Sequence, residues 1–219
     1  MTNTLAAPRV RVVLDRLLAA ADDQERAGTL PSSTDRLMES MSALERAEAL
    51  QDAYLPVSPE GGQLLYALTR ASRPDTIVEF GTSFGISTIY LAAAVADNGT
   101  GQLLTTELSS RKITAAGANL AEAGLDGPVT ILAGDALETL ADVPGPVGLV
   151  LLDGWKDLCL PVLRLLEPRL APGALVVADD ISFPSMAGYL AYVRDPARGY
   201  VSVAFPVADG MELSSWTGR

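Results

Sequence analysis

Acidic residues follow five short apolar runs of this sequence, and carboxylates spaced in this way could form one site. Each run is rich in Val, Ile, Leu and Thr, which is typical of a buried strand. The runs with their acids are 76–79, 103–107, 129–135, 149–153 and 175–180. In a parallel α/β sheet, ligands bind outside the carboxyl ends of the strands. We therefore expect these carboxylates at that edge: Glu79, Glu107, Asp135, Asp153, Asp179 and Asp180. Such a row of acids repels phosphate and suits a cationic ligand, hydroxyl groups or a metal ion.

The elements that must position these acids alternate along the chain. Between about 75 and 195, the strand-like runs are separated by stretches with helical spacing of apolar residues, which is typical of βαβ units. The tail differs, because 200–205 and 211–216 alternate apolar and polar residues and are joined by 206–210. The sequence therefore predicts an α/β protein with a doubly wound, mostly parallel sheet that a C-terminal antiparallel hairpin closes at one edge.

Two helices are predicted before the sheet, over 8–27 and 33–52, because apolar residues recur there at the spacing of one helix face. Residues 31–34 would form the turn and cap between them. Ser58 and Pro59 then predict the start of a further helix, since proline is favoured at the first helical position. The apolar face of the first helix must be buried somewhere, so we expect a homodimer that uses the N-terminal helices or the C-terminal hairpin. This face holds Val10, Val13, Leu14, Leu17 and Leu18.

The composition excludes several classes of partner. Lys and Arg number 16 against 27 Asp and Glu, and the net charge of −11 argues against nucleic acid and anionic membranes. The longest uninterrupted apolar run, 89–96, is too short to span a bilayer. The single cysteine, Cys159, allows no internal disulfide and fits the reducing cytoplasm. Because there is no histidine, a metal site would need oxygen ligands, which select Mg²⁺, Ca²⁺ or Mn²⁺.

A glycine-containing loop follows the first predicted strand. Gly81 and Gly85 allow the backbone to approach a ligand closely, although a tight strand-to-helix turn alone would also explain them. The loop is not a dinucleotide fingerprint, because Ser83 and Ile86 stand where glycines are required, and no Gly-Lys-Ser/Thr of a P-loop follows. Glu107 ends the second strand, where an acid can accept two hydrogen bonds from a ribose diol. Loop and acid together predict a nucleoside ligand.

Several pieces of this sequence resemble the class I S-adenosylmethionine-dependent methyltransferases, between about 56 and 212. They are 57–60, 78–81 with 85–87, Glu107, 134–136, 152–161 and 175–180. The most specific is Asp-Gly-Trp-Lys-Asp at 153–157, followed about 25 residues on by Ala-Asp-Asp. This pair of motifs is similar to the cation-dependent catechol and caffeoyl-coenzyme A O-methyltransferases. The resemblance implies a Rossmann-like sheet of seven strands, a cofactor-binding methyltransferase domain over 56–219, and a helical lid or dimer element over 1–55.

The resemblance also implies a role for each matched residue. The methionine part of the cofactor would lie against Val57, Glu79, Gly81 and Ser87, and the ribose hydroxyls against Glu107. The rest of the cofactor site would be formed by Asp135, Ala136, Asp153 and Trp155, with the indole packed on the adenine ring. The metal ligands would be Asp153, Asp179 and Asp180. Lys156 would be the general base, next to Asp153.

These residues suit one reaction. The sulfonium of S-adenosylmethionine is a cation, which acidic and aromatic groups favour. A divalent ion bound by two adjacent substrate hydroxyls lowers their pKa and holds one oxygen in line with the methyl carbon. We therefore expect transfer of a methyl group from S-adenosylmethionine to a hydroxyl of a small phenolic or catechol-like acceptor, assisted by Mg²⁺ or another divalent cation. The alternatives are a metal-independent methyltransferase acting on an amine, carboxylate or carbon of a natural product, and a non-catalytic nucleotide-binding protein.

Two positions depart from the pattern of this family. Asp180 stands where the third metal ligand is usually Asn, and it adds a negative charge. The catechol-type enzymes also carry a substrate-binding acid near the chain end, and that position falls near Val203, which cannot serve. Glu212 could compensate, although a glutamate on a terminal strand is more commonly solvated.

Simpler interpretations exist for the predicted site residues. Asp153 and Asp179 could cap the helices that follow their strands. Lys156 could be a surface lysine, and Trp155 could belong to the core. Cys159 is most simply a small buried hydrophobic residue on the same predicted helix.

Overall fold

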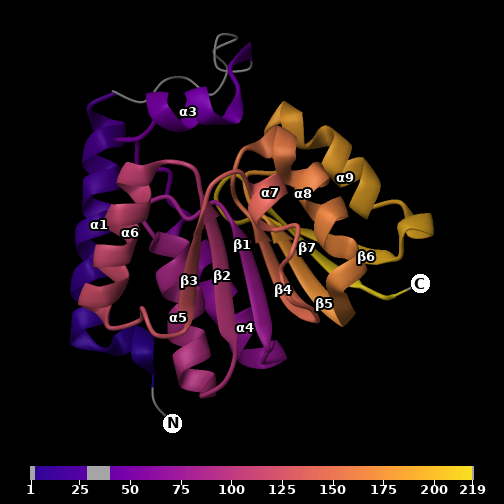
Figure 1. The fold of residues 1–219 in the computed structure, drawn as a ribbon, viewed down its shortest axis with the longest axis horizontal. Helices are drawn as coiled ribbons and strands as arrows, with labels where there is room; N and C mark the ends of the chain where they lie inside the picture. The colour runs from indigo at the N-terminus through magenta and orange to yellow at the C-terminus, as the bar shows by residue number, and fades with distance from the viewer. Residues whose placement is uncertain (1–2, 29–39, 219) are drawn as a thin grey trace.

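A computed structural model gives the fold of residues 3–28 and 40–218 (Figure 1). Its centre is a seven-stranded sheet with the strand order β3-β2-β1-β4-β5-β7-β6. The strands are β1 Thr76–Phe80, β2 Gln102–Glu107, β3 Val129–Ala133, β4 Val147–Leu152, β5 Leu170–Ala178, β6 Tyr200–Phe205 and β7 Met211–Trp216. The first five strands run parallel, whereas β7 pairs antiparallel with both β5 and β6. The predicted doubly wound sheet with its C-terminal hairpin is confirmed.

Helices cover both faces of this sheet. They are α1 Pro8–Arg26, α3 Ala43–Ala49, α4 Pro59–Ser72, α5 Ile86–Asn98, α6 Ser110–Ala123, α7 Ala136–Thr139, α8 Cys159–Leu166 and α9 Ala187–Val193, with short 3-10 turns that include η2 Lys156–Leu158. One apolar core lies between the sheet and α1, α4, α5 and α6, and a second lies between the sheet and α7, α8 and α9 (Figure 1). Of the helices in the described ranges, none is long and apolar enough to cross a membrane.

The apolar face of α1 is buried within its own chain. Val10, Val13, Leu14 and Leu17 all lie in the core that α1 shares with α5 and α6. This face therefore needs no partner subunit, and the reason given above for a homodimer through α1 is wrong.

The second N-terminal helix differs from its prediction over 33–52. Residues 33–39 of this prediction lie outside the described residues. Within the described part of that range, Ser40 is helical, Met41 and Ser42 are not, and α3 runs over Ala43–Ala49. The cause is a capping box, in which the Glu45 backbone N–H donates to Ser42 Oγ and the Ser42 N–H donates to the Glu45 carboxylate. The predicted turn at 31–34 lies outside the described residues. By contrast, the predicted start of α4 is confirmed, because Ser58 accepts a hydrogen bond from the Gly61 N–H.

Candidate functional site

A cavity of about 820 Å³ opens at the carboxyl ends of the parallel strands. Its wall includes most of the residues that the sequence selected: Val57, Gly81, Ser87, Glu107, Asp135, Ala136, Asp153, Trp155, Lys156 and Asp180. Two selected residues, Glu79 and Asp179, are buried and do not line the cavity. The strand order reverses between β1 and β4, which is the place where open α/β sheets bind ligands.

The loops after β1 and β4 touch through their backbones. Gly81 has φ +103°, and a Cβ atom built on it would lie 2.8 Å from the carbonyl carbon of Asp153. Only glycine fits this contact without a shift of the backbone. The Asp153 N–H also donates to the carbonyl of Phe80 at 2.9 Å. The two halves of the cavity are therefore held together at its floor.

Glu107 is held in place by backbone groups. Its Oε2 accepts the N–H of Ser83 at 2.9 Å, and its Oε1 accepts the N–H groups of Leu108 and Ser109, each at 2.9 Å. Ser83 reaches this position with φ +48°, a conformation that glycine adopts more readily. A carboxylate has about four lone-pair sites, so Glu107 keeps some capacity to accept a hydrogen bond from a ligand in the cavity.

Glu79 lies beneath the glycine loop and is fully buried. Thr88 Oγ1 donates to its Oε2 at 2.6 Å. Burial raises the pKa of Glu79 to about 7, although hydrogen bonds from Ser87 and its neighbours oppose that rise. Glu79 is therefore bonded to the first turn of α5, whose Ser87 lines the cavity, and its Oε1 is buried without a hydrogen-bond partner among the described residues.

Asp135 is both a helix cap and a residue of the cavity wall. Its side chain caps α7 by accepting the N–H of Leu137 at 2.8 Å, and the residue also lines the cavity beside Ala136. Because the cap fixes this turn, Asp135 and Ala136 form a rigid part of the wall.

Three aspartates form an acidic cluster at the ends of β4 and β5. One carboxylate oxygen from each of Asp153, Asp179 and Asp180 lies within 4.8 Å of the other two. Oxygens that ligate one Mg²⁺ at about 2.1 Å lie at most about 4.2 Å apart, so small side-chain movements would complete such a site. Burial and then the charges of Asp153 and Asp180 raise the pKa of Asp179 to about 8, and a bound cation would relieve both effects. The donor set therefore fits a hard divalent ion.

The backbone at this cluster explains one departure from the family pattern. Asp180 has φ +56°, in the left-handed region where Asn and Asp are enriched among non-glycine residues. Asp can therefore replace Asn here without a change of backbone. Asp153 and Asp179 do not cap the turns and helices that follow their strands, so the interpretation as caps is wrong.

Lys156 lies between two of these acids. Its Nζ is 2.9 Å from Asp153 Oδ1 and 2.9 Å from Asp180 Oδ2, and its side chain is only 14% exposed. The interpretation as a surface lysine is therefore wrong. Burial by itself would lower the pKa of Lys156, but the charges of Asp153 and Asp180 raise it above the ordinary value. Lys156 is thus held as an ammonium ion by the acidic cluster.

Two neighbours of Lys156 differ in their burial. Trp155 is partly buried: it lines the cavity and also packs against the second core. Cys159, at the start of α8, is completely buried in the second core, as predicted.

Asp209 is a cavity residue that the sequence did not reveal. It lies in the turn between β6 and β7 and lines the same wall as Asp180. Its carbonyl accepts the N–H of Ser182, and the carbonyl of Gly210 accepts the N–H of Ile181, each at 3.1 Å. Asp209 therefore brings a carboxylate to the cavity, whereas Val203 and Glu212 do not line it. The available signal was an acid in a predicted turn that returns to the carboxyl edge.

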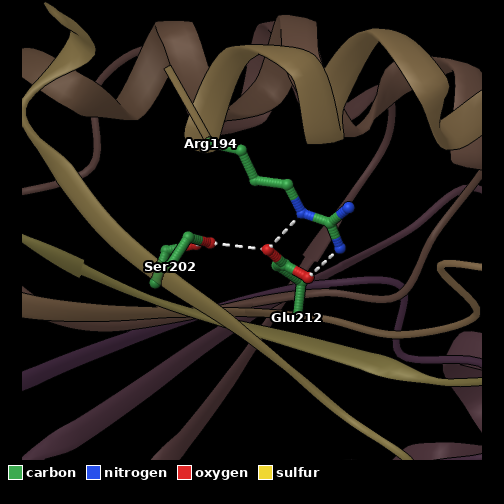
Figure 2. Close-up of polar contacts among 4 residues, drawn as sticks. Arg194, Ser202 and Glu212 are labelled. Carbon is green, nitrogen blue, oxygen red and sulfur yellow. Dashed lines mark hydrogen bonds and ion pairs between the residues drawn. The ribbon is translucent and has the colours of Figure 1, made fainter. Parts of the chain in front are cut away.

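Glu212 is buried and lies outside the cavity wall, which contradicts its expected solvation and its compensating role. Figure 2 shows its carboxylate between Arg194 and Ser202. Arg194 Nε donates to Oε1 at 2.8 Å, the Arg194 Nη2 donates to Oε2 at 2.6 Å, and Ser202 Oγ donates to Oε1 at 2.8 Å. The reason is topological, since β7 lies between β5 and β6 and is not an edge strand.

Comparisons with known proteins agree with this geometry. The family model described as "Methyltransferase domain" matches residues 78–181. The chain is 28% identical to catechol O-methyltransferase B of Danio rerio, over 81% of this chain and 72% of that protein. It is 31% identical to the catechol O-methyltransferase of Niastella koreensis, over 63% of this chain and 65% of that protein. It is also 31% identical to a transmembrane O-methyltransferase homolog of Mus musculus, over 74% of this chain and 68% of that protein.

Solved structures share the architecture. The O-methyltransferase TomG of Streptomyces achromogenes, solved in complex with S-adenosylmethionine, matches with a TM-score of 0.66 and 28% identity, over 82% of this chain and 91% of that chain. An O-methyltransferase of Bacillus cereus, solved with S-adenosylhomocysteine, matches with a TM-score of 0.66 over 91% of this chain and 99% of that chain. At 20% identity, this second match shows the fold alone.

The buried ion pair of Glu212 gives a prediction for stability. Glu212→Gln should lower the free energy of unfolding by about 1–3 kcal/mol at pH 7, because Arg194 loses its charged acceptor. Burial opposes ionisation, but hydrogen bonds from Arg194 and Ser202 lower the pKa of Glu212 below 4.5. The stabilisation is therefore present above pH 4.5 and is lost as the pH falls through the folded value. Urea unfolding should show a difference between variant and wild type that shrinks towards pH 3; an equal difference at both pH values would contradict it.

Proposed function

Because the chain belongs to the class I S-adenosylmethionine-dependent O-methyltransferases of the catechol and caffeoyl-coenzyme A type, we propose that it methylates a hydroxyl of a small phenolic or catechol-like molecule with the help of a divalent cation. One observation carries this proposal. Two acids of the acidic cluster, Asp153 and Asp180, line a single cavity together with Lys156, Glu107 and the hairpin acid Asp209. A cation-binding end and a nucleoside-binding end in one cavity suit a reaction between a sulfonium cofactor and a hydroxyl acceptor.

The cofactor would occupy the side of the cavity formed by β1, β2 and β4. Glu107 would accept from the ribose hydroxyls, Trp155 and Ala136 would lie against adenine, and Ser87 would bind the methionine end. Gly81, which lines this side of the cavity, presents no side chain to such a ligand. When bound, S-adenosylmethionine supplies an electrophilic methyl group on a sulfonium cation, which the surrounding carboxylates favour.

The acceptor would lie at the other side, near the acidic cluster. A divalent ion held by Asp153, Asp179 and Asp180 would supply positive charge that lowers the pKa of the acceptor hydroxyl. Lys156 Nζ, paired with Asp153 and Asp180, would receive the hydroxyl proton only when these two carboxylates support its ammonium form less strongly. Asp209 would accept a hydrogen bond from a second hydroxyl, which favours a diol over a single phenol.

The N-terminal residues 1–55 are proposed as a lid on the methyltransferase domain of residues 56–219. Support comes from the residues of this element that line the cavity: Ala21, Asp22, Glu25, Arg46, Ala47, Leu50, Tyr54 and Leu55. The cytoplasm stays a prediction that rests on the single cysteine.

Cofactor binding tests the nucleoside half of the proposal. The protein should bind S-adenosylmethionine or S-adenosylhomocysteine with a micromolar Kd, and it should bind NAD and ATP negligibly. Glu107→Ala should weaken this binding by about 1–3 kcal/mol, because hydrogen bonds to a charged group are lost. Calorimetry measures both values, with the exposed acid variant Glu138→Ala as a control that binds like wild type. Equal affinity for NAD would contradict the assignment.

Metal removal tests the catalytic half. Excess EDTA should abolish turnover of a catechol and Mg²⁺ should restore it, because the three aspartates would hold the ion. Asp179→Asn, which changes a buried residue that does not line the cavity, should cripple turnover and leave the cofactor Kd nearly unchanged. The exposed variant Asp126→Asn should do neither. Lys156→Ala should lower turnover on the order of 10²- to 10⁴-fold if the amine accepts the proton. Full turnover in EDTA would instead favour the metal-independent alternative.

A homodimer is proposed through β6 in place of α1. Among the described strands, β6 forms one edge of the sheet, and it exposes Val201 (68%) and Val203 (53%). Exposed apolar residues on an open edge strand favour pairing with a second chain. Light scattering at micromolar concentration should give a dimer for wild type and a monomer for the double variant Val201→Lys, Val203→Lys. A monomeric wild type would refute the dimer.

A further inference from the structure

Arg46 on α3 joins the N-terminal element to the loop that follows β4. Its Nη1 and Nη2 donate to the two carboxylate oxygens of Asp157, at 2.8 Å and 3.0 Å. Its guanidinium also lies over the ring of Trp155, 4.9 Å from the centroid. One side chain therefore binds a residue on each side of Lys156.

This arrangement buries much of a cation. The Arg46 side chain is only 13% exposed, and its Nε is buried with no hydrogen-bond partner among the described residues. A bidentate carboxylate and an aromatic face are the two partners that best compensate a guanidinium for lost water. The geometry is thus specific for arginine, because a lysine ammonium is a point charge that cannot form the planar pair and the stack together.

The contacts bear on the site through the chain itself. Trp155, Lys156 and Asp157 are consecutive and belong to a single short turn, whose internal support includes the Leu158 N–H bond to the Trp155 carbonyl at 2.9 Å. A turn this short has few interactions of its own, so an anchor at both ends limits its freedom. Arg46, which lies outside this turn, therefore restrains both the indole of Trp155 and the backbone that carries Lys156.

We propose that Arg46 is a positioning residue for methyl transfer: it fixes Trp155 as a wall for the cofactor and keeps Lys156 at the acidic cluster. The proposal rests on the proposed function. It also gives α3 a defined part in the reaction, since a helix outside the sheet holds the loop that carries the proton acceptor.

The experiment compares Arg46→Ala and Arg46→Lys with a matched control, Arg16→Ala. Arg16 also ties the N-terminal element to the rest of the chain, by an ion pair with Glu122, but it does not line the cavity. Arg46→Ala should raise the Kd for S-adenosylhomocysteine about 5- to 30-fold, the range of a lost cation–π contact with its ion pair. It should also lower kcat about tenfold or more, with Arg46→Lys only partly restoring both values. Arg16→Ala should leave both values at the wild-type level.

A fluorescence readout reports the arrangement directly. In a Trp216→Phe background, Trp155 is the sole tryptophan, since the chain has two. Arg46→Ala should then make Trp155 more accessible to acrylamide quenching, and Arg16→Ala should not. Wild-type Kd, kcat and quenching in Arg46→Ala would overturn the proposal, as would equal losses in Arg16→Ala. A wild-type protein that binds no S-adenosylhomocysteine would overturn the proposed function and this proposal together, which distinguishes that failure from a failure confined to Arg46.

Discussion

Carboxylates gathered at one edge of a sheet repel one another, and the arrangement of this site depends on how each charge is balanced. Glu107 is balanced by three backbone N–H groups, and Asp153 and Asp180 share the ammonium of Lys156. Asp179 lies beside these two acids, and burial together with their charges raises its pKa. The excess of negative charge is therefore concentrated where three carboxylate oxygens already converge.

The same edge is divided into two parts by the order of the strands. The loop after β1 and the acid of β2 lie on one side, and the acidic cluster of β4 and β5 lies on the other. The backbone contact between Gly81 and Asp153 joins the two parts without a side chain in between. Two ligands bound in the two parts would thus meet at a separation set by the backbone, which side-chain motion does not change.

Local signals in the sequence predicted the fold well. Alternation identified the hairpin, and Ser58 with Pro59 identified the start of α4, because both depend on neighbouring residues. The cap at Ser42 was equally local but was overridden by an apolar periodicity that continues past it. The burial of Glu212 could not be read in this way, because it depends on β7 pairing with β5 rather than on its own sequence.

The site residues selected from the sequence mostly stand at the ends of strands, and most of them line the cavity. Arg46 reaches the cavity from a short helix, and only the three-dimensional packing reveals it. Asp209 reaches the cavity from a hairpin turn, and an acid in that predicted turn was its sole sequence signal. Neither residue belongs to a motif with fixed spacing from the strands. Such residues lie beyond sequence patterns because their distance from the site in the chain carries no information about their distance in space.

The charge of the cavity wall has a consequence for turnover. Acids outnumber bases on this wall; the acids are Asp22, Glu25, Glu107, Asp135, Asp153, Asp157, Asp180 and Asp209, and the bases are Arg46, Lys112 and Lys156. In the proposed reaction, the cofactor enters as a sulfonium and leaves as a neutral thioether, so its attraction to the wall ends with the chemistry. Product inhibition would be weakened by charge alone, without a moving part. Added salt would screen the attraction between the sulfonium cofactor and the acidic wall, but it would leave the binding of the neutral thioether unchanged. The difference in affinity between cofactor and product would therefore become smaller.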